Sequence, residues 1–351
     1  MTHHFLRRRT LGFVSALGVA ALVLSGCGSD STDDPDSPET ADEGEAAGGD
    51  SDGEDLEAIT VGISQFVQHP ALDAATAGFK QAFIDAGYVE GDTVTFDEQN
   101  AQGDVANTTT IAQQFSNDDV DLVLAVATPA AQAAAQNILD IPVLFTAVTD
   151  PVEAGLVDSE DAPGGNVTGT SDMNPVADQI ELIKEIVPDA AKVGIVYSSG
   201  EVNSEVQVEL AKEAGEDLGI EIVEATVTNS SEVQQATESL GDVDAIYVPT
   251  DNQVVSGISA LVQVAEDNGI AVIGAEAGTV EGGAIATIGI DYERLGMQTG
   301  EMALRALDGE DPASMAVETL DDLELVVSPD AAERMGITLP DGFEDKADRV
   351  L

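Results

Sequence analysis

Few side chains in this chain have the types and spacing that catalysis requires. The 351 residues include one cysteine, Cys27, and three histidines, of which only His69 lies beyond the first four positions. No cluster of Cys and His has metal-ligand spacing, and the sequence has neither a phosphate-binding GxxxxGK[ST] loop nor a GxSxG nucleophile elbow. A histidine-based triad would have to depend on His69 alone. We therefore expect no catalytic residue, no metal and no cofactor, and interpret the chemistry of the chain as ligand binding.

Candidate ligand-binding residues lie at predicted turns from strand to helix. They are Gln65, Phe66, Thr128, Thr149, Ser199, Asn203, Asp251 and Glu276. Thr128 precedes Pro129, a pair typical of a helix N-cap and first helical residue, so the turn would present free N–H groups to a ligand carboxylate. Ser199 and Asn203 suit a carboxylate in the same way. A helix cap without any ligand explains each of these residues as well.

Two acidic residues follow later strands and suit a ligand ammonium. Asp251 comes after residues 248–250, and Glu276 comes after residues 273–275. Each residue is also a suitable N-cap for the next helix. The first turn, residues 64–70, is long and contains Gln65, Phe66 and His69, so it would line or cover a pocket; His69 before a proline also fits a helix cap. Thr149 lies in a further candidate turn.

The elements that must position these residues alternate regularly along the chain. Apolar runs typical of buried strands occupy residues 59–63, 93–96, 121–126 and 142–145, and then 193–197, 221–223, 245–248 and 270–273. Segments with helical periodicity follow them at residues 70–86, 105–115 and 129–137, and then 202–218, 231–240 and 252–268. This alternation predicts an α/β fold with two doubly wound parallel-sheet lobes joined by a hinge. Ligands of such folds bind at the carboxyl ends of the strands.

We expect the first lobe to span residues 58–166 and the second to span residues 167–283. The turn at Gly164-Gly165-Asn166 is interpreted as the crossover between them. Residues 284–351 contain leftover strands and a helix, which we expect to return and complete both lobes.

The N-terminal 27 residues have the pattern of an export signal. Arg7, Arg8 and Arg9 precede an apolar segment at residues 11–24, which is too short to span a bilayer. The following Leu24-Ser25-Gly26-Cys27 resembles a bacterial lipobox, which implies lipidation of Cys27 and an extracytoplasmic location. An ordinary secretory signal with an incidental cysteine is the alternative. Arg8-Arg9 also resembles a twin-arginine signal, so both export routes stay open.

Acidic residues dominate the rest of the chain. Residues 28–57 contain thirteen acids and no Lys or Arg, which predicts a disordered stalk. The whole chain carries a formal charge of −55. Such a charge argues against nucleic acid and anionic lipid surfaces as partners. Because molar salt shortens electrostatic screening to about 3 Å, we interpret the acidity as adaptation to a halophilic environment; an acidic, ligand-repelling surface is the alternative.

Several turn sequences together resemble a known family. They are residues 64–73 with Gly78-Phe79, residues 127–132, 148–151, 197–203 and 249–252, and residues 281–284 continuing through 289–292 to Leu295-Gly296. In this order they resemble the TrpX-like solute-binding lipoproteins of ABC importers, over residues 59 to about 339. The resemblance implies a type I periplasmic-binding-protein fold with three hinge segments, and an aromatic amino acid as the ligand of some members.

For such a ligand, the resemblance implies a role for each turn. Thr128, Ser199 and Asn203 would lie near the carboxylate, Asp251 would lie near the ammonium, and Phe66 would face the ring.

The sequence thus predicts a membrane-anchored receptor that delivers a small solute, most simply tryptophan, tyrosine or phenylalanine, to an ABC permease and its cytoplasmic ATPase. The chain itself lacks the ATPase phosphate loop. A receptor for a sugar or nucleoside, and an extracytoplasmic sensory protein, are the alternatives. An enzyme on the same scaffold would need a pair of carboxylates about 5–9 Å apart beside the cleft.

Overall fold

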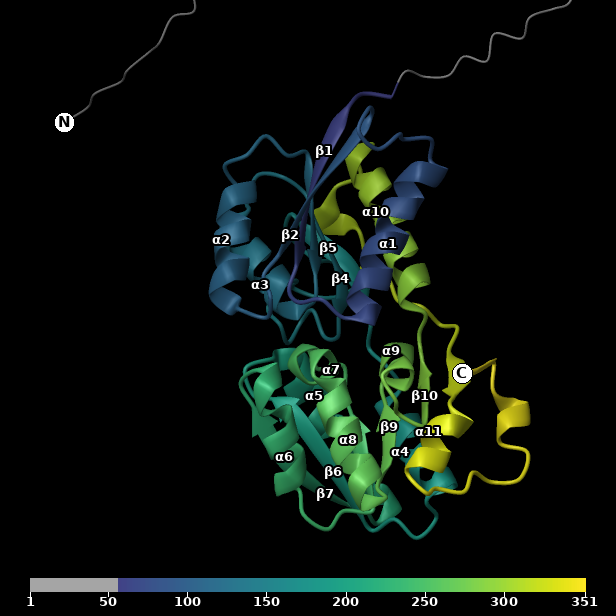
Figure 1. Cartoon of the computed structure of the whole chain (residues 1–351). Helices are drawn as coiled ribbons and strands as arrows, with labels where there is room; N and C mark the ends of the chain where they lie inside the picture. The colour runs from purple at the N-terminus through teal and green to yellow at the C-terminus, as the bar shows by residue number, and fades with distance from the viewer. Residues whose placement is uncertain (1–55) are drawn as a thin grey trace, which may run out of the picture. The chain divides into compact units, whose positions relative to one another are not determined.

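Two parallel sheets covered by helices make up the part of the chain that the computed structural model describes, residues 56–351 (Figure 1). The predicted signal peptide, Cys27 and nearly all of the acidic segment lie outside the described residues. None of the helices within residues 56–351 is long and apolar enough to cross a bilayer.

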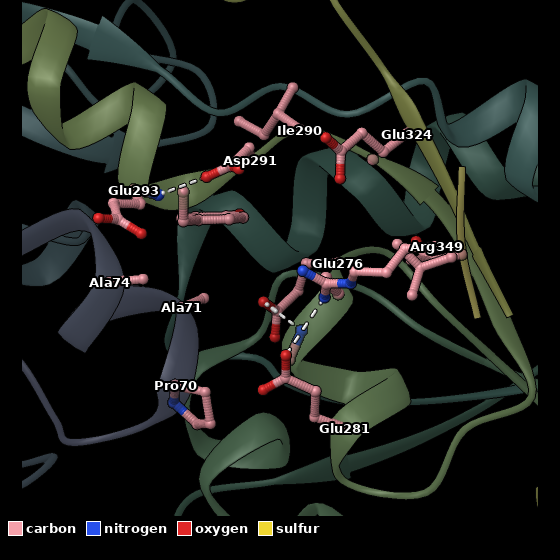
Figure 2. Close-up of a pocket in the computed structure, with 16 residues that line it drawn as sticks. Pro70, Ala71, Ala74, Glu276, Glu281, Ile290, Asp291, Glu293, Glu324 and Arg349 are labelled. Atoms are coloured by element: carbon pink, nitrogen blue, oxygen red, sulfur yellow. Dashed lines mark hydrogen bonds and ion pairs between the residues drawn. The ribbon is translucent and has the colours of Figure 1, made fainter. Parts of the chain in front are cut away.

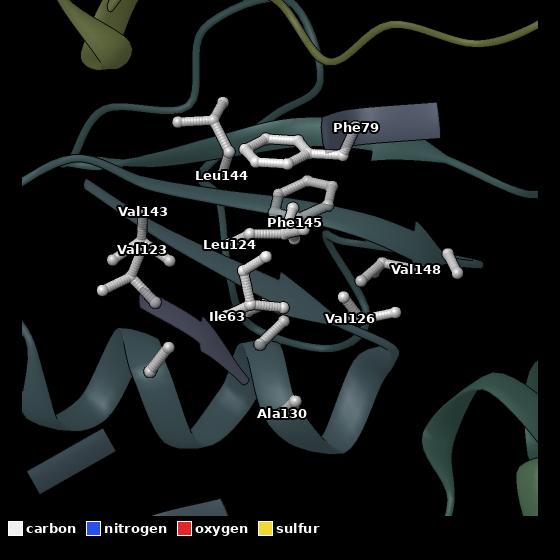
Figure 3. Close-up of a cluster of buried hydrophobic side chains, with 14 of the residues drawn as sticks. Ile63, Phe79, Val123, Leu124, Val126, Ala130, Val143, Leu144, Phe145 and Val148 are labelled. Atoms are coloured by element: carbon white, nitrogen blue, oxygen red, sulfur yellow. The ribbon is translucent and has the colours of Figure 1, made fainter. Parts of the chain in front are cut away.

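The first lobe contains a five-stranded parallel sheet in the order β2-β1-β3-β4-β5. Its elements are β1 (Ile59–Gln65), α1 (Pro70–Asp85), β2 (Val94–Asn100), α2 (Val105–Phe115), β3 (Leu122–Val126), α3 (Thr128–Asn137), β4 (Val143–Val148) and β5 (Val167–Ser171). Strands β3, β4 and β5 are buried along their whole length, as expected for parallel strands covered on both faces. Figure 3 shows this core, with Phe79 of α1 near Leu144 and Phe145 and with Ala130 of α3 across the sheet.

The second lobe contains a seven-stranded sheet in the order β12-β11-β10-β9-β8-β6-β7. Its elements are α4 (Val176–Ile186), β6 (Lys192–Ser198), α5 (Val202–Leu218), β7 (Glu221–Val227), α6 (Val233–Ser239), β8 (Ala245–Val248), α7 (Asn252–Ser256), α8 (Ile258–Asn268), β9 (Ala271–Gly274), α9 (Ala277–Glu281), β10 (Ala286–Gly289), β11 (Glu324–Val327), α11 (Pro329–Arg334) and β12 (Arg349–Val350). Short 3-10 helices occupy Ser230–Glu232 and Glu344–Lys346 in this lobe, and Pro312–Ser314 beside β5 of the first lobe. Only the pairing of β10 with β11 is antiparallel.

The chain passes between the lobes three times. It leaves the first lobe after β5, returns after β10 to form α10 (Tyr292–Leu307) against α1, and leaves again before β11 (Figure 1). Residues 284–351 therefore contribute to both lobes. Before the last crossing, the chain also bridges β5 at Thr170 and Glu318.

The expected boundary at residues 166/167 was wrong. Strand β5 begins at Val167, is fully buried and pairs with β4, so it belongs to the first sheet. The Gly164-Gly165-Asn166 turn only closes the connection from β4 to β5. The first crossing follows Ser171 instead, because the chain first forms β5, the edge strand of that sheet, against β4.

Glycines allow α10 to lie directly on α1. A Cβ atom added to Gly78 would lie 1.9 Å from the carbonyl oxygen of Glu293, and one added to Gly296 would lie 1.9 Å from that of Ala75. The two backbones therefore touch where no side chain fits. This contact anchors the start of α10, and with it the second crossing, to the first lobe.

Candidate ligand-binding cleft

The carboxyl ends of strands from both lobes meet around one small space, which we call the interlobe cavity. It is lined by His69, Ala71, Leu72, Ala147, Asp172, Asn203, Thr250, Asn252, Val255, Glu276 and Tyr292. Its volume is about 10 Å³, which is close to the minimum that one water needs. The lobes are therefore closed on each other, and an amino acid can enter only if they separate.

Three hydrogen bonds hold the lobes together at this cleft. His69 Nε2 lies 3.3 Å from Asn252 Oδ1, and the hydroxyl oxygens of Thr149 and Thr250 lie 3.3 Å apart. The Gln253 amide donates to the Gly103 carbonyl at 2.9 Å. Each pair joins one lobe to the other, so all three must break when the lobes open.

His69 is buried in this closed arrangement and is uncharged at neutral pH. Burial lowers the pKa of His69 to about 4, although the hydrogen bond with Asn252 and the nearby carboxylate of Asp73 oppose this shift. The Asn252 side-chain nitrogen donates to Glu201, so Asn252 Oδ1 accepts and His69 Nε2 carries the proton. His69 Nδ1 is buried without a hydrogen-bond partner.

Asp172 and Tyr292 form a second buried group, at the hinge. Asp172 accepts hydrogen bonds from the Tyr292 hydroxyl at 2.7 Å and from the Thr149 hydroxyl at 3.0 Å. Burial raises the pKa of Asp172, and these two hydrogen bonds oppose the shift. Burial and the neighbouring Asp172 raise the pKa of Tyr292 well above its ordinary value. Neither residue was among the candidates, because the boundary expected at 166/167 concealed that Asp172 follows a strand of the first sheet.

Glu276 reaches the interlobe cavity from the second lobe. It is the N-cap of α9, where one carboxyl oxygen accepts from the Gly278 N–H at 3.3 Å, and its other oxygen is buried without a partner. Burial raises the pKa of Glu276 to about 8, and the charges of Asp172 and Glu281 add to this shift. Glu276 is thus a cap and a cavity residue at the same time.

A second cavity of about 200 Å³ lies beside the hinge and also has Glu276 in its lining; we call it the hinge-side cavity (Figure 2). The two cavities share Ala71, Glu276 and Tyr292. The charged residues in the lining of the hinge-side cavity are five acids and one base, Arg349, which forms an ion pair with Glu281 at 3.2 Å. Asp291, at the same cavity, caps α10 by accepting from the backbone N–H groups of residues 293 and 294.

Two of the candidate residues, Asn203 and Glu276, line the interlobe cavity, and Thr149 lies beside it in contact with Asp172 and Thr250. Asn203 lines it with a side-chain oxygen that is buried and has no partner. Asp251 does not line it. Asp251 is fully buried in the second lobe, where its carboxylate accepts from the Val254 N–H and from Ser198 and Ser204. In this structure Asp251 is the N-cap of α7, and its side-chain hydrogen bonds lie within the second lobe.

The other candidates lie elsewhere in the closed arrangement. Gln65 is held by Val67, Asp73 and Thr76.

Phe66 belongs to the core of the first lobe, and Ser199 is exposed. Thr128 is buried, and its hydroxyl has no partner. It is the first helical residue of α3 and not the expected N-cap: Ala127 holds that position with φ 79°, because the chain turns sharply out of β3 one residue earlier.

Comparisons with known proteins show that this chain is similar to substrate-binding proteins. The family model described as ABC transporter substrate binding protein matches residues 60–351. A protein of Clostridioides difficile (strain R20291) named tyrosine-binding protein is 46% identical over 276 residues, which are 78% of this chain and 80% of that protein.

Two solved structures cover 84% of this chain and differ in ligand state. The ABC domain from Streptococcus pneumonia in complex with L-Trp is 36% identical, with a TM-score of 0.81 over 100% of its length. The ligand-free, open structure of a substrate-binding protein with adhesive properties from Clostridium difficile is 44% identical, with a TM-score of 0.64 over 99% of its length. The less identical but liganded structure thus superimposes better, which agrees with lobes that are closed here.

Proposed function

Because this chain belongs to the family of ABC transporter substrate-binding proteins, we propose that it captures an aromatic amino acid between its lobes and delivers it to an ABC permease. The permease works with a cytoplasmic ATPase, which this chain is not. The observation that carries the proposal is the interlobe cavity, where polar groups from both lobes and from the hinge converge on one enclosed point. The tyrosine-binding relative and the tryptophan complex support an aromatic amino acid as the ligand.

The cavity supports a capture mechanism by lobe closure. A ligand that contacts both lobes favours the closed state over the open one, whereas a ligand that contacts one lobe shifts nothing. Here the cavity is too small for an amino acid, and the three interlobe hydrogen bonds replace contacts that a ligand would make. The ligand therefore enters the open form. It then binds between Asn203 and Glu276 of the second lobe and His69 of the first lobe.

We propose minor roles in ligand binding for the other candidate residues. Thr128 offers a buried, unpartnered hydroxyl at the first turn of α3, where free backbone N–H groups favour a carboxylate. Gln65, Phe66 and Ser199 would reach the ligand only after movement of their turns, and Asp251 would act through the turn that it caps.

From the N-terminal pattern we propose that the receptor is located at the outer face of the cell membrane. In this proposal Cys27 carries the lipid, and the acidic stalk separates the folded lobes from the bilayer. Labelling with a radioactive fatty acid tests the anchor: the wild type should incorporate the label, and C27A should not. Equal labelling of the two proteins would contradict the assignment.

The acidity supports function in high salt. Residues 58–351 contain 54 acids and nine Lys or Arg, so the folded part repels itself in dilute buffer, and molar salt screens this repulsion. Unfolding temperatures measured from dilute buffer to molar potassium chloride should rise steadily. A constant unfolding temperature over that series would remove the halophilic proposal.

Ligand identity is tested with the full-length chain purified in detergent and molar salt. Thermal unfolding is followed with each of tryptophan, tyrosine and phenylalanine, with alanine as the control that lacks a ring, and with sugars and nucleosides. A ligand at 100 times its dissociation constant should stabilise the protein by about 2.7 kcal/mol, a rise of several degrees. A rise with sugars or nucleosides alone, or with none of these compounds, would contradict the proposed ligand.

A further inference from the structure

Glu201 is a buried acidic residue that does not line the interlobe cavity. It forms hydrogen bonds with Asn203 and Asn252, which do line the cavity. It precedes α5 and is 3% exposed. Its oxygens accept from the side-chain amides of Asn203 at 3.2 Å and Asn252 at 2.5 Å, and from the backbone N–H groups of Asn252 and Gln253 at 3.3 Å each. All four of these groups donate, so both asparagines turn their NH₂ groups toward Glu201 and their oxygens away from it.

The first consequence concerns Asn203. Its NH₂ group donates to Glu201 and also to the Thr250 carbonyl at 2.9 Å. A carbonyl only accepts, so this contact settles which end of the amide is nitrogen. Asn203 Oδ1 is left buried and unpartnered, in a residue that lines the interlobe cavity. Asn203 therefore offers the cleft an acceptor.

The second consequence concerns Asn252. Its NH₂ group is committed to Glu201, and its oxygen points across the cleft to His69. When the lobes open, the His69 contact is lost and Asn252 Oδ1 becomes a second free acceptor. The unpartnered oxygen of Glu276 and the carboxylate of Asp172 lie in the lining of the same cavity.

A cavity wall of hydrogen-bond acceptors discriminates between the ammonium and the carboxylate of an amino acid. A ligand carboxylate placed against Asn203 Oδ1 and Asn252 Oδ1 would meet oxygen lone pairs, whereas an ammonium brings three N–H donors and no acceptor. A buried acceptor without a donor is costly, and a charged donor satisfies it most strongly.

We propose that Glu201 is a positioning residue for ligand specificity: it turns the amide oxygens of Asn203 and Asn252 into the cleft, where they and Glu276 bind the ligand's ammonium group. This inference rests on the proposed function, and it differs from the expectation that Asn203 serves the carboxylate.

The test compares L-tyrosine with 3-(4-hydroxyphenyl)propionate, which has the same ring and carboxylate but no ammonium. Isothermal titration calorimetry of the full-length chain gives the ratio of the two affinities. Because hydrogen bonds to charged groups contribute about 1.5–3 kcal/mol, the wild type should prefer tyrosine by about 10-fold to 100-fold.

E201M should lose most of this preference. Both asparagine amides donate to the same oxygen of Glu201, Oε2. A methionine of similar length offers no acceptor there, so both amides are free to rotate and present their NH₂ to the cleft. The ratio should fall at least about fivefold, mainly through weaker tyrosine binding. E201D keeps a carboxylate and should recover part of the ratio. E213Q removes the same charge from an exposed position on α5 and should leave the ratio unchanged.

The affinity ratio separates positioning from a structural role, because a merely destabilised protein loses both ligands together. If E201M does not give a cooperative unfolding transition, N203A carries the same test, since it removes the acceptor and keeps Glu201. An unchanged ratio in whichever of these variants folds would overturn the inference. Equal wild-type affinity for the two compounds would overturn it as well but keep the receptor. Absence of binding by all three aromatic amino acids would contradict the proposed function and this inference with it.

Discussion

The Tyr292 hydroxyl donates a 2.7 Å hydrogen bond to Asp172, and these two residues stand on different crossings between the lobes. Asp172 follows β5 at the first crossing, and Tyr292 begins α10 at the second. Both are buried and line the interlobe cavity. The hinge is therefore tied together at the point where the ligand is expected to bind.

Removing this hydroxyl should destabilise the protein. Y292F leaves one oxygen of the buried Asp172 without its donor, so the free energy of unfolding should fall by about 1–3 kcal/mol, as measured by chemical denaturation in molar salt. Y197F is the matched control, because the Tyr197 hydroxyl donates to Glu224 near the surface; its effect should stay within about 0.5 kcal/mol. If both variants lose the same free energy of unfolding, the hydrogen bond at the hinge contributes no more to stability than one near the surface.

Ligand binding should weaken in acid because of His69. The closed state lowers the pKa of His69 from 6.5 to about 4, so closure requires the neutral imidazole. Its contribution is fully present above pH 6.5 and is lost as the pH falls from 6.5 toward 4. Affinity for L-tyrosine should drop about tenfold or more between pH 7 and pH 5.

H69Q isolates this effect, since His69 is the only histidine after residue 4. Calorimetry of H69Q over the same pH range should show a flatter profile, with only the contributions of the carboxylates remaining. A drop in H69Q as steep as that of the wild type would assign the acid sensitivity to another group.

Glu276 should make the ligand-free protein less stable as the pH rises, whereas His69 weakens ligand binding as the pH falls. Its pKa is raised from 4.5 to about 8, so the folded state retains a proton that the unfolded chain releases. The contribution to stability is present below pH 4.5 and is lost as the pH rises through about 8. E276Q cannot ionise, so relative to the wild type it should gain at least about 1 kcal/mol between pH 5 and pH 9.

The matched control for this prediction is E301Q, which removes an exposed carboxylate from α10. Its difference from the wild type should not change with pH over that interval. If urea unfolding shows the same pH dependence for E276Q and the wild type, Glu276 is ionised in the folded state at neutral pH.

The contact between α1 and α10 should tolerate no side chain at Gly296. G296A places a Cβ atom 1.9 Å from the Ala75 carbonyl oxygen, so the helices must separate at a cost of about 3 kcal/mol or more. G165A is the control, because its added Cβ meets nothing within 4 Å. Thermal unfolding should show a large decrease for G296A alone; similar melting of the two variants would mean that α10 shifts without cost.

Much of the fold was predictable because parallel strands and their helices leave local signatures. Continuous apolar runs such as Leu122–Val126 indicated buried strands, and the helical segment at Val202–Leu218 was expected with the same bounds. Strand β5 was assigned to the wrong lobe, since five buried residues pair equally well in either sheet as far as their own sequence is concerned. Hydrogen bonding to β4, the preceding strand, decides the question.

The division is similar at the cleft. The order of strands, helices and polar turns determined by itself that both lobes present short polar residues at the carboxyl ends of their strands, and it named Asn203, Thr149 and Glu276. Only the tertiary structure decided that Asp251 turns inward as a cap, that Asp172 and Tyr292 meet at the hinge, and that Glu201 orients two asparagines. Local sequence sets what a side chain is able to bind, but its actual partners come from segments that are brought together by folding.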